Sequence, residues 1–144
     1  MRPAVLTGLV FAVLGLVVHA QGGQAGDGRP AKFLGSCEAD VTGDGRAELV
    51  QLVETIRGVE LIAMVPTDAG GYSAFLLRRD KPGSAGILQC QYAPEVTETR
   101  AGPGDRQPRV RKTPGAFVHL LFRETSSVAC VWTQNRFSEI WTSG

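Results

Sequence analysis

The sequence lacks an excess of charge of either sign. It has 15 Lys and Arg residues against 14 Asp and Glu, a formal net charge of +1 over 144 residues. A broad nucleic-acid-binding surface needs a strong basic excess, so the composition argues against one. The length allows one domain, and a 43% hydrophobic and 20% charged composition is typical of a globular protein. We expect a single globular domain that does not bind nucleic acid.

The sequence also lacks the common catalytic motifs. It has no G-x-S-x-G elbow, no G-x-x-x-x-G-K-[ST] phosphate loop and no C-x-x-C pair. Beyond the first 20 residues the only histidine is His119, which lies in an apolar run where a structural histidine is more common than a catalytic one. Acid–base cleavage of a glycoside by Glu38, Asp40, Asp44 or Glu48 is an alternative. Because acids on a glycine-rich loop more often hold a cation, we expect no catalysis.

The one long hydrophobic run lies at the N-terminus. An uncharged apolar stretch from Ala4 to Val18 follows Arg2, and small residues occupy positions 18 and 20. Its 15 residues fit a signal-peptide core and fall short of the roughly 20 that span a membrane. We predict a signal peptide over residues 1–20, with cleavage after Ala20 or, as second choice, after Ala25. An uncleaved membrane anchor is the alternative.

Export makes the mature chain neutral and permits a disulfide. Removing residues 1–20 takes away Arg2 and no acid, which leaves 14 basic and 14 acidic residues. We expect a secreted or periplasmic protein with no stable membrane span. The mature part holds Cys37, Cys90 and Cys130. Three cysteines allow one bridge and leave one thiol, and the sequence alone does not select among the three pairings.

The remaining chain has the pattern of a β-protein. A glycine-rich leader over 21–31 precedes a single domain over 32–144, for which we predict an antiparallel meander or small sandwich of about 6–7 strands. Turn residues separate the strands at 68–71, 80–83 and 133–136, and Asn135 suits a positive φ. For 47–56 a short helix is the alternative. The expected strands are 47–56, 59–67, 72–79, 86–92, 116–123, 127–133 and 136–142.

A stretch rich in proline and glycine interrupts this pattern at 94–115. It predicts a long loop, either solvated or forming a contact surface for an acidic partner. Trp141, near the C-terminus, is the aromatic residue that we most expect to be exposed. A metal-independent module or inhibitor that binds a protein or glycan through this surface is the alternative function. Its expected residues are Arg106, Arg109, Arg111, Lys112 and Trp141.

One acidic segment carries the pattern of a cation site. Asp40-Val-Thr-Gly-Asp-Gly-Arg-Ala-Glu48 places oxygen-bearing side chains at positions 40, 42, 44 and 48, and two glycines let the chain turn tightly. Ca²⁺ takes six to eight hard oxygen ligands, and such loops supply them. The predicted ligands are Asp40, Thr42, Asp44, Glu48 and the backbone carbonyl of Arg46. The alternative is a metal-free turn in which Asp40 and Asp44 accept hydrogen bonds from backbone N–H groups.

The helix-loop-helix calcium motif is excluded. That motif requires a bidentate Glu at the twelfth loop position, where this sequence has Gln51. No helical pattern precedes the loop, and a strand is predicted after it.

The segment Asp40 to Val50 resembles the calcium loop of FG-GAP/VCBS-type repeats, in which an acidic loop leads directly into a β-strand. The resemblance covers about residues 36 to 80, one repeat, which cannot form a propeller. It implies a Ca²⁺ ion held by Asp40, Asp44 and Glu48. Thr42 stands where the pattern usually has Asp or Asn, and Glu48 stands where it usually has the shorter Asp. We therefore expect a weak site, with a dissociation constant on the order of 10⁻⁴ to 10⁻³ M.

The C-terminal segment 125–143 resembles the last hairpin of small exported bacterial proteins with a single acidic loop, a largely uncharacterised family. In those proteins a core aromatic residue stands at the position of Cys130. The resemblance therefore implies that Cys130 is the free thiol and that Cys37 and Cys90 form the bridge. Together, these features predict an exported β-domain with one structural Ca²⁺.

Overall fold

The computed structural model describes residues 30–84, 86–99, 107–123 and 126–143. The predicted signal peptide and the leader up to residue 29 lie outside them. The described chain is all-β, with eight antiparallel strands in two sheets, and the predicted fold class is confirmed. Within this part no helix is long and apolar enough to cross a membrane. The strands are β1 (Lys32–Ala39), β2 (Glu48–Thr55), β3 (Gly58–Pro66), β4 (Tyr72–Asp80), β5 (Gly86–Glu98), β6 (Arg109–Phe122), β7 (Ser127–Thr133) and β8 (Arg136–Ser143).

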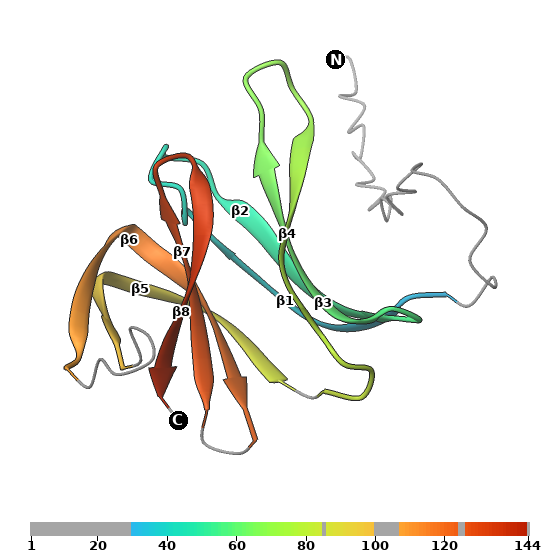
Figure 1. Ribbon diagram of the computed structural model, residues 1–144. Helices are drawn as coiled ribbons and strands as arrows, with labels where there is room; N and C mark the ends of the chain where they lie inside the picture. The colour runs from blue at the N-terminus through green and yellow to red at the C-terminus, as the bar shows by residue number, and fades with distance from the viewer. Residues whose placement is uncertain (1–29, 85, 100–106, 124–125, 144) are drawn as a thin grey trace, which may run out of the picture.

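The first sheet contains β1 to β4 in sequence order (Figure 1). Alternate residues of β2 and β3 face the core, with Val50, Leu52 and Leu61 at most 1% exposed. This alternation excludes the helix considered for 47–56. Gly58, the first residue of β3, has a φ of 131°, and a Cβ atom there would lie 2.0 Å from the carbonyl oxygen of Asp80. Only glycine allows β4 to approach this turn so closely.

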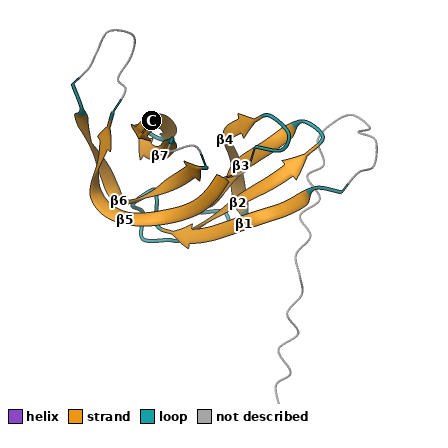
Figure 2. Ribbon diagram, turned by 90° about the horizontal axis from the view of Figure 1, so that it is seen from below, coloured by secondary structure: helices purple, strands orange, loops and turns teal. Residues whose placement is uncertain are grey.

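The second sheet contains β5 to β8 and curls back on itself. Figure 2 shows β5 and β6 bending sharply, so that their distal ends rise away from the first sheet. At the end of the bend the backbone N–H of Thr99 donates to the carbonyl of Trp141 at 2.8 Å, which joins the end of β5 to β8. Val96 of β5 then packs in a small core with Val131 and Ile140 inside the curl.

The prediction of a long loop over 94–115 is wrong at both ends. Strand β5 continues to Glu98 and β6 begins at Arg109, while residues 100–106 lie outside the described part. The register of β5 against β6 shifts once, between Ala93 and Glu95. Pro94 of β5 and Pro114 of β6 lie at this shift. A proline has no N–H to donate, so prolines at a bulge remove no ladder hydrogen bond and the hairpin continues.

The two sheets share a core and one covalent link. The core contains Val50, Leu52, Leu61, Val118, Leu120 and Val128. The disulfide joins Cys37 of β1 to Cys90 of β5, with a Cα–Cα distance of 5.7 Å, and Cys130 is a buried free thiol. The structure therefore has the pairing that the resemblance implied. The predicted β7–β8 turn is also present, with φ angles of 51° at Gln134 and 60° at Asn135.

Candidate metal centre

The acidic loop connects β1 to β2 and packs against the second sheet. Gly43 and Gly45 have φ angles of 78° and 84°, the left-handed region that glycine adopts most readily. A Cβ atom at Gly43 would lie 2.7 Å from the Cβ of Pro114 in β6. The loop therefore turns tightly while its tip lies directly against the bend of the β5–β6 hairpin.

Asp40 binds the backbone at the tip of the loop. Its Oδ1 accepts hydrogen bonds from the backbone N–H groups of Gly43 at 2.6 Å and Asp44 at 3.1 Å. Its Oδ2 accepts one from Gly45 at 2.8 Å. These bonds hold three successive amides around one carboxylate, as the metal-free alternative for Asp40 requires.

Glu48 binds the first residues of the loop from inside the protein. It is the first residue of β2 and is 0% exposed. Its Oε2 accepts from the backbone N–H groups of Val41 at 2.7 Å and Thr42 at 3.1 Å, and its Oε1 accepts from the Thr42 hydroxyl at 3.0 Å. Burial raises the pKa of Glu48, and these hydrogen bonds only partly oppose the effect.

Asp44 lies on the exposed side of the loop, where Arg46 binds it. The Arg46 guanidinium donates to Asp44 Oδ2 at 2.5 and 2.9 Å, and the backbone N–H of Arg46 donates to Oδ1 at 2.9 Å. Hydrogen bonds from Arg46 lower the pKa of Asp44. The same guanidinium reaches Asp68, in the β3–β4 turn, at 3.0 Å. The sequence pattern predicted only the backbone carbonyl of Arg46 as a ligand and gave no signal for this role of its side chain.

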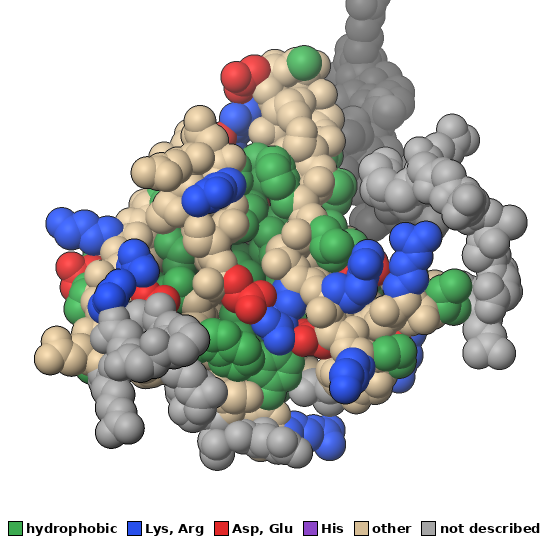
Figure 3. Space-filling view, viewed as in Figure 1, with side chains coloured by type: hydrophobic (Ala, Val, Ile, Leu, Met, Phe, Trp, Pro, Cys, Tyr) green, Lys and Arg blue, Asp and Glu red, His purple; other side chains and the backbone are tan. Residues whose placement is uncertain are grey.

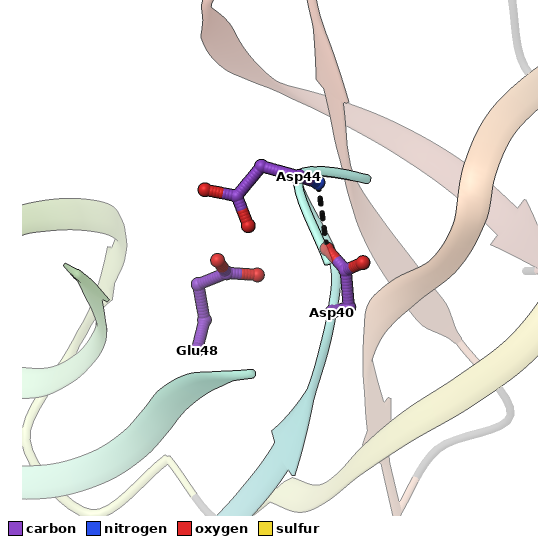
Figure 4. A group of neighbouring side chains, drawn as sticks. All are labelled: Asp40, Asp44 and Glu48. Atoms are coloured by element: carbon purple, nitrogen blue, oxygen red, sulfur yellow. Dashed lines mark hydrogen bonds between the residues drawn. The ribbon is translucent and has the colours of Figure 1, made fainter. Parts of the chain in front are cut away.

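The three carboxylates form one group. One oxygen from each of Asp40, Asp44 and Glu48 lies within 4.8 Å of the others. Figure 4 shows the carboxylates of Asp44 and Glu48 pointing toward each other, with Asp40 bonded to the backbone of Asp44. The Thr42 hydroxyl, predicted as a ligand, instead donates to Glu48.

This donor set fits a hard divalent cation. A carboxylate has about four acceptor positions. Each of the three accepts three hydrogen bonds, so about one acceptor position per carboxylate remains. Three carboxylate oxygens with water as the remaining ligands match the preference of Ca²⁺. The Arg46 guanidinium is the cation that competes with the metal at Asp44.

The residues predicted for a partner-binding surface do not form a free basic patch among the described residues. Arg106 lies outside the described part. Arg111 pairs at 2.7 Å with Glu98, which is 7% exposed. Arg109 and Lys112 are exposed on β6. On the face of the molecule drawn in Figure 3, basic side chains are scattered among acidic and neutral ones.

Trp141 is partly buried rather than fully exposed, because it packs against the core of the two sheets. The Arg78 guanidinium lies 5.4 Å from the centroid of its ring. The expectation of an exposed Trp141 is therefore wrong.

His119 has the contacts of a structural residue. Its Nε2 lies 3.0 Å from the Thr142 hydroxyl, and its ring packs against Phe117. Its Nδ1 is buried with no hydrogen-bond partner among the described residues. Burial lowers its pKa.

Comparisons of the chain with protein-family models, curated proteins and solved structures found no match.

Proposed function

We propose that this protein is an exported β-domain that binds one Ca²⁺ ion in the loop between Asp40 and Glu48. The observation that carries the proposal is the approach of three carboxylate oxygens, one from each acid, to within 4.8 Å of one another. The resemblance of this loop to FG-GAP/VCBS repeats points to the same ion. The Cys37–Cys90 disulfide supports an oxidising compartment outside the cytoplasm.

The role of the ion is structural, without catalysis. Burial of the Glu48 carboxylate disfavours its charged form, so a cation at this position offsets a cost that the metal-free protein bears at neutral pH. Bound to all three acids, the ion links the loop to the first residue of β2. Because the loop tip contacts Pro114, the ion also stabilises the loop against the second sheet.

Thermal unfolding of the disulfide-bonded protein in EDTA and in 10 mM Ca²⁺ tests the proposal, with Mg²⁺ as the comparison. For a dissociation constant of about 10⁻⁴ to 10⁻³ M, linkage gives roughly 1.4 to 2.7 kcal/mol of stabilisation. We expect a rise in Tm of roughly 5 to 10 °C. Mg²⁺ produces a smaller rise, since it dehydrates reluctantly and demands six ligands in a strict octahedron.

Two variants of matched chemistry locate the site. Asp44→Asn removes one anionic ligand and should abolish most of the Ca²⁺-dependent rise. Asp68→Asn removes the other partner of Arg46, an acid that is 97% exposed and outside the carboxylate group, and should retain the rise. No Ca²⁺-specific shift, or an equal shift in both variants, contradicts the proposal and leaves a metal-free turn.

A further inference from the structure

A cavity with a different chemistry lies where β4, β6 and β8 end. Its volume is about 490 Å³, within the range of small-molecule sites, and none of its lining residues belongs to the acidic loop. Phe122 at the end of β6 and Trp141 in β8 provide apolar walls. Ser84, Arg123 and Ser126 line it from the connections that follow β4 and β6.

Arg78 is a fixed part of the wall. It donates to Asp80 through two bonds of 2.7 Å and to Glu139 at 2.5 Å. Its guanidinium carbon lies 5.4 Å from the ring centroids of both Phe122 and Trp141. Two acids therefore more than offset the charge of Arg78, and two aromatic rings flank its guanidinium. Each carboxylate oxygen of Asp80, the acid that lines the cavity, accepts one of these bonds.

The remaining polar side chains in the lining are Arg123, Ser84 and Ser126. Within the described part of the chain, neither the guanidinium of Arg123 nor the hydroxyls of Ser84 and Ser126 have a side-chain partner. An arginine presents five N–H donors in a fork that matches a carboxylate, and each hydroxyl adds one donor. The cavity thus combines an available cation and two hydroxyls with two aromatic walls.

We propose that this cavity binds a small organic carboxylate with a ring-sized apolar part. The carboxylate accepts hydrogen bonds from Arg123 and the two serines, and the apolar part packs against Phe122 and Trp141. The carboxylate of such a ligand matches the donors in the lining, and its flat apolar part matches the two aromatic side chains. This site is independent of the proposed Ca²⁺ site, and neither proposal requires the other.

Benzoate is the probe, and benzyl alcohol is its uncharged counterpart of similar shape. The assay follows the two indole N–H signals of the disulfide-bonded protein by NMR. Trp141 lines the cavity, whereas Trp132 lies outside its lining, 5.7 Å from the ring of Phe75. We expect benzoate to shift the Trp141 signal saturably while the Trp132 signal stays in place. Benzyl alcohol should bind at least about tenfold more weakly, since it lacks the charge-assisted bonds.

Two variants locate the carboxylate. Arg123→Gln should weaken benzoate binding at least about tenfold, because it removes a charge-assisted fork. Arg136→Gln, at the exposed start of β8 and outside the cavity, should leave the affinity unchanged. The proposal is overturned by equal affinity for the acid and the alcohol, by unchanged binding in Arg123→Gln, by equal shifts of both indole signals, or by no Trp141 shift at 10 mM benzoate.

Discussion

Removing the disulfide should cost a large part of the stability of this domain. Cys37 and Cys90 lie 53 residues apart in the sequence and join β1 of one sheet to β5 of the other. In the chain-entropy model, a cross-link that closes a loop of this length destabilises the unfolded state by about 4 kcal/mol at 25 °C. The free energy of unfolding of such domains is only about 5–15 kcal/mol, so the bridge supplies a substantial fraction of the stability.

The double variant Cys37→Ala/Cys90→Ala measures this contribution by urea unfolding. With an m-value of about 1–3 kcal/mol/M, a loss of 4 kcal/mol lowers the midpoint by roughly 1–4 M. Reduction of the native protein should lower the midpoint as the double variant does. The third cysteine, Cys130, does not interfere, because its thiol is buried and burial raises its pKa to about 12. A loss below about 1 kcal/mol would refute the reasoning, since the bridge would then not restrict the unfolded chain.

Two further predictions concern a glycine and a histidine. Gly43→Ala should destabilise the protein by at least about 1 kcal/mol more than Gly45→Ala: both have positive φ, but only at Gly43 does a Cβ meet Pro114, at 2.7 Å. Equal losses in urea unfolding would argue against that contact. Because burial lowers the pKa of His119 below 6.5, the unfolded chain binds the proton more readily, so stability falls as the pH drops from about 7 through this lowered pKa. His119→Gln should flatten that part of the stability–pH curve; an unchanged curve would assign it to other groups.

Local signals in the sequence predicted most of the fold. Seven of the eight strands follow from short β-type runs between turn residues, continuous in 127–133 and alternating in 86–92. Strand β1 was missed because it is an edge strand in which only Ala39 is buried, so its sequence shows no apolar alternation. The far ends of β5 and β6 were missed because Pro94 and Pro114 resemble loop residues unless their bulge is known. Their pairing depends on partners distant in the chain.

The candidate site was predictable only in part. The spacing of Asp40, Asp44 and Glu48 is local, and one tight loop brings all three together. The competing cation was not predictable, because Arg46 is oriented by Asp68 from a different turn as well as by its neighbour Asp44. The contact between Gly43 and Pro114 likewise depends on how the two sheets pack.

Glu48 explains why the proposed metal site is expected to be weak. It is a longer acid than the Asp that FG-GAP/VCBS-type loops usually have at the corresponding position. In the fold this length lets its carboxylate reach the backbone of Val41 and Thr42 from a buried position. Asp40 performs the same task for the other half of the loop. The loop is therefore already closed by hydrogen bonds, and these bonds occupy most of the acceptor positions that a metal ion would need. A metal must also displace Arg46 from Asp44 or share that carboxylate with it. Both effects reduce the net free energy of binding, so an ion held here stabilises a preformed loop by a modest amount rather than inducing its fold.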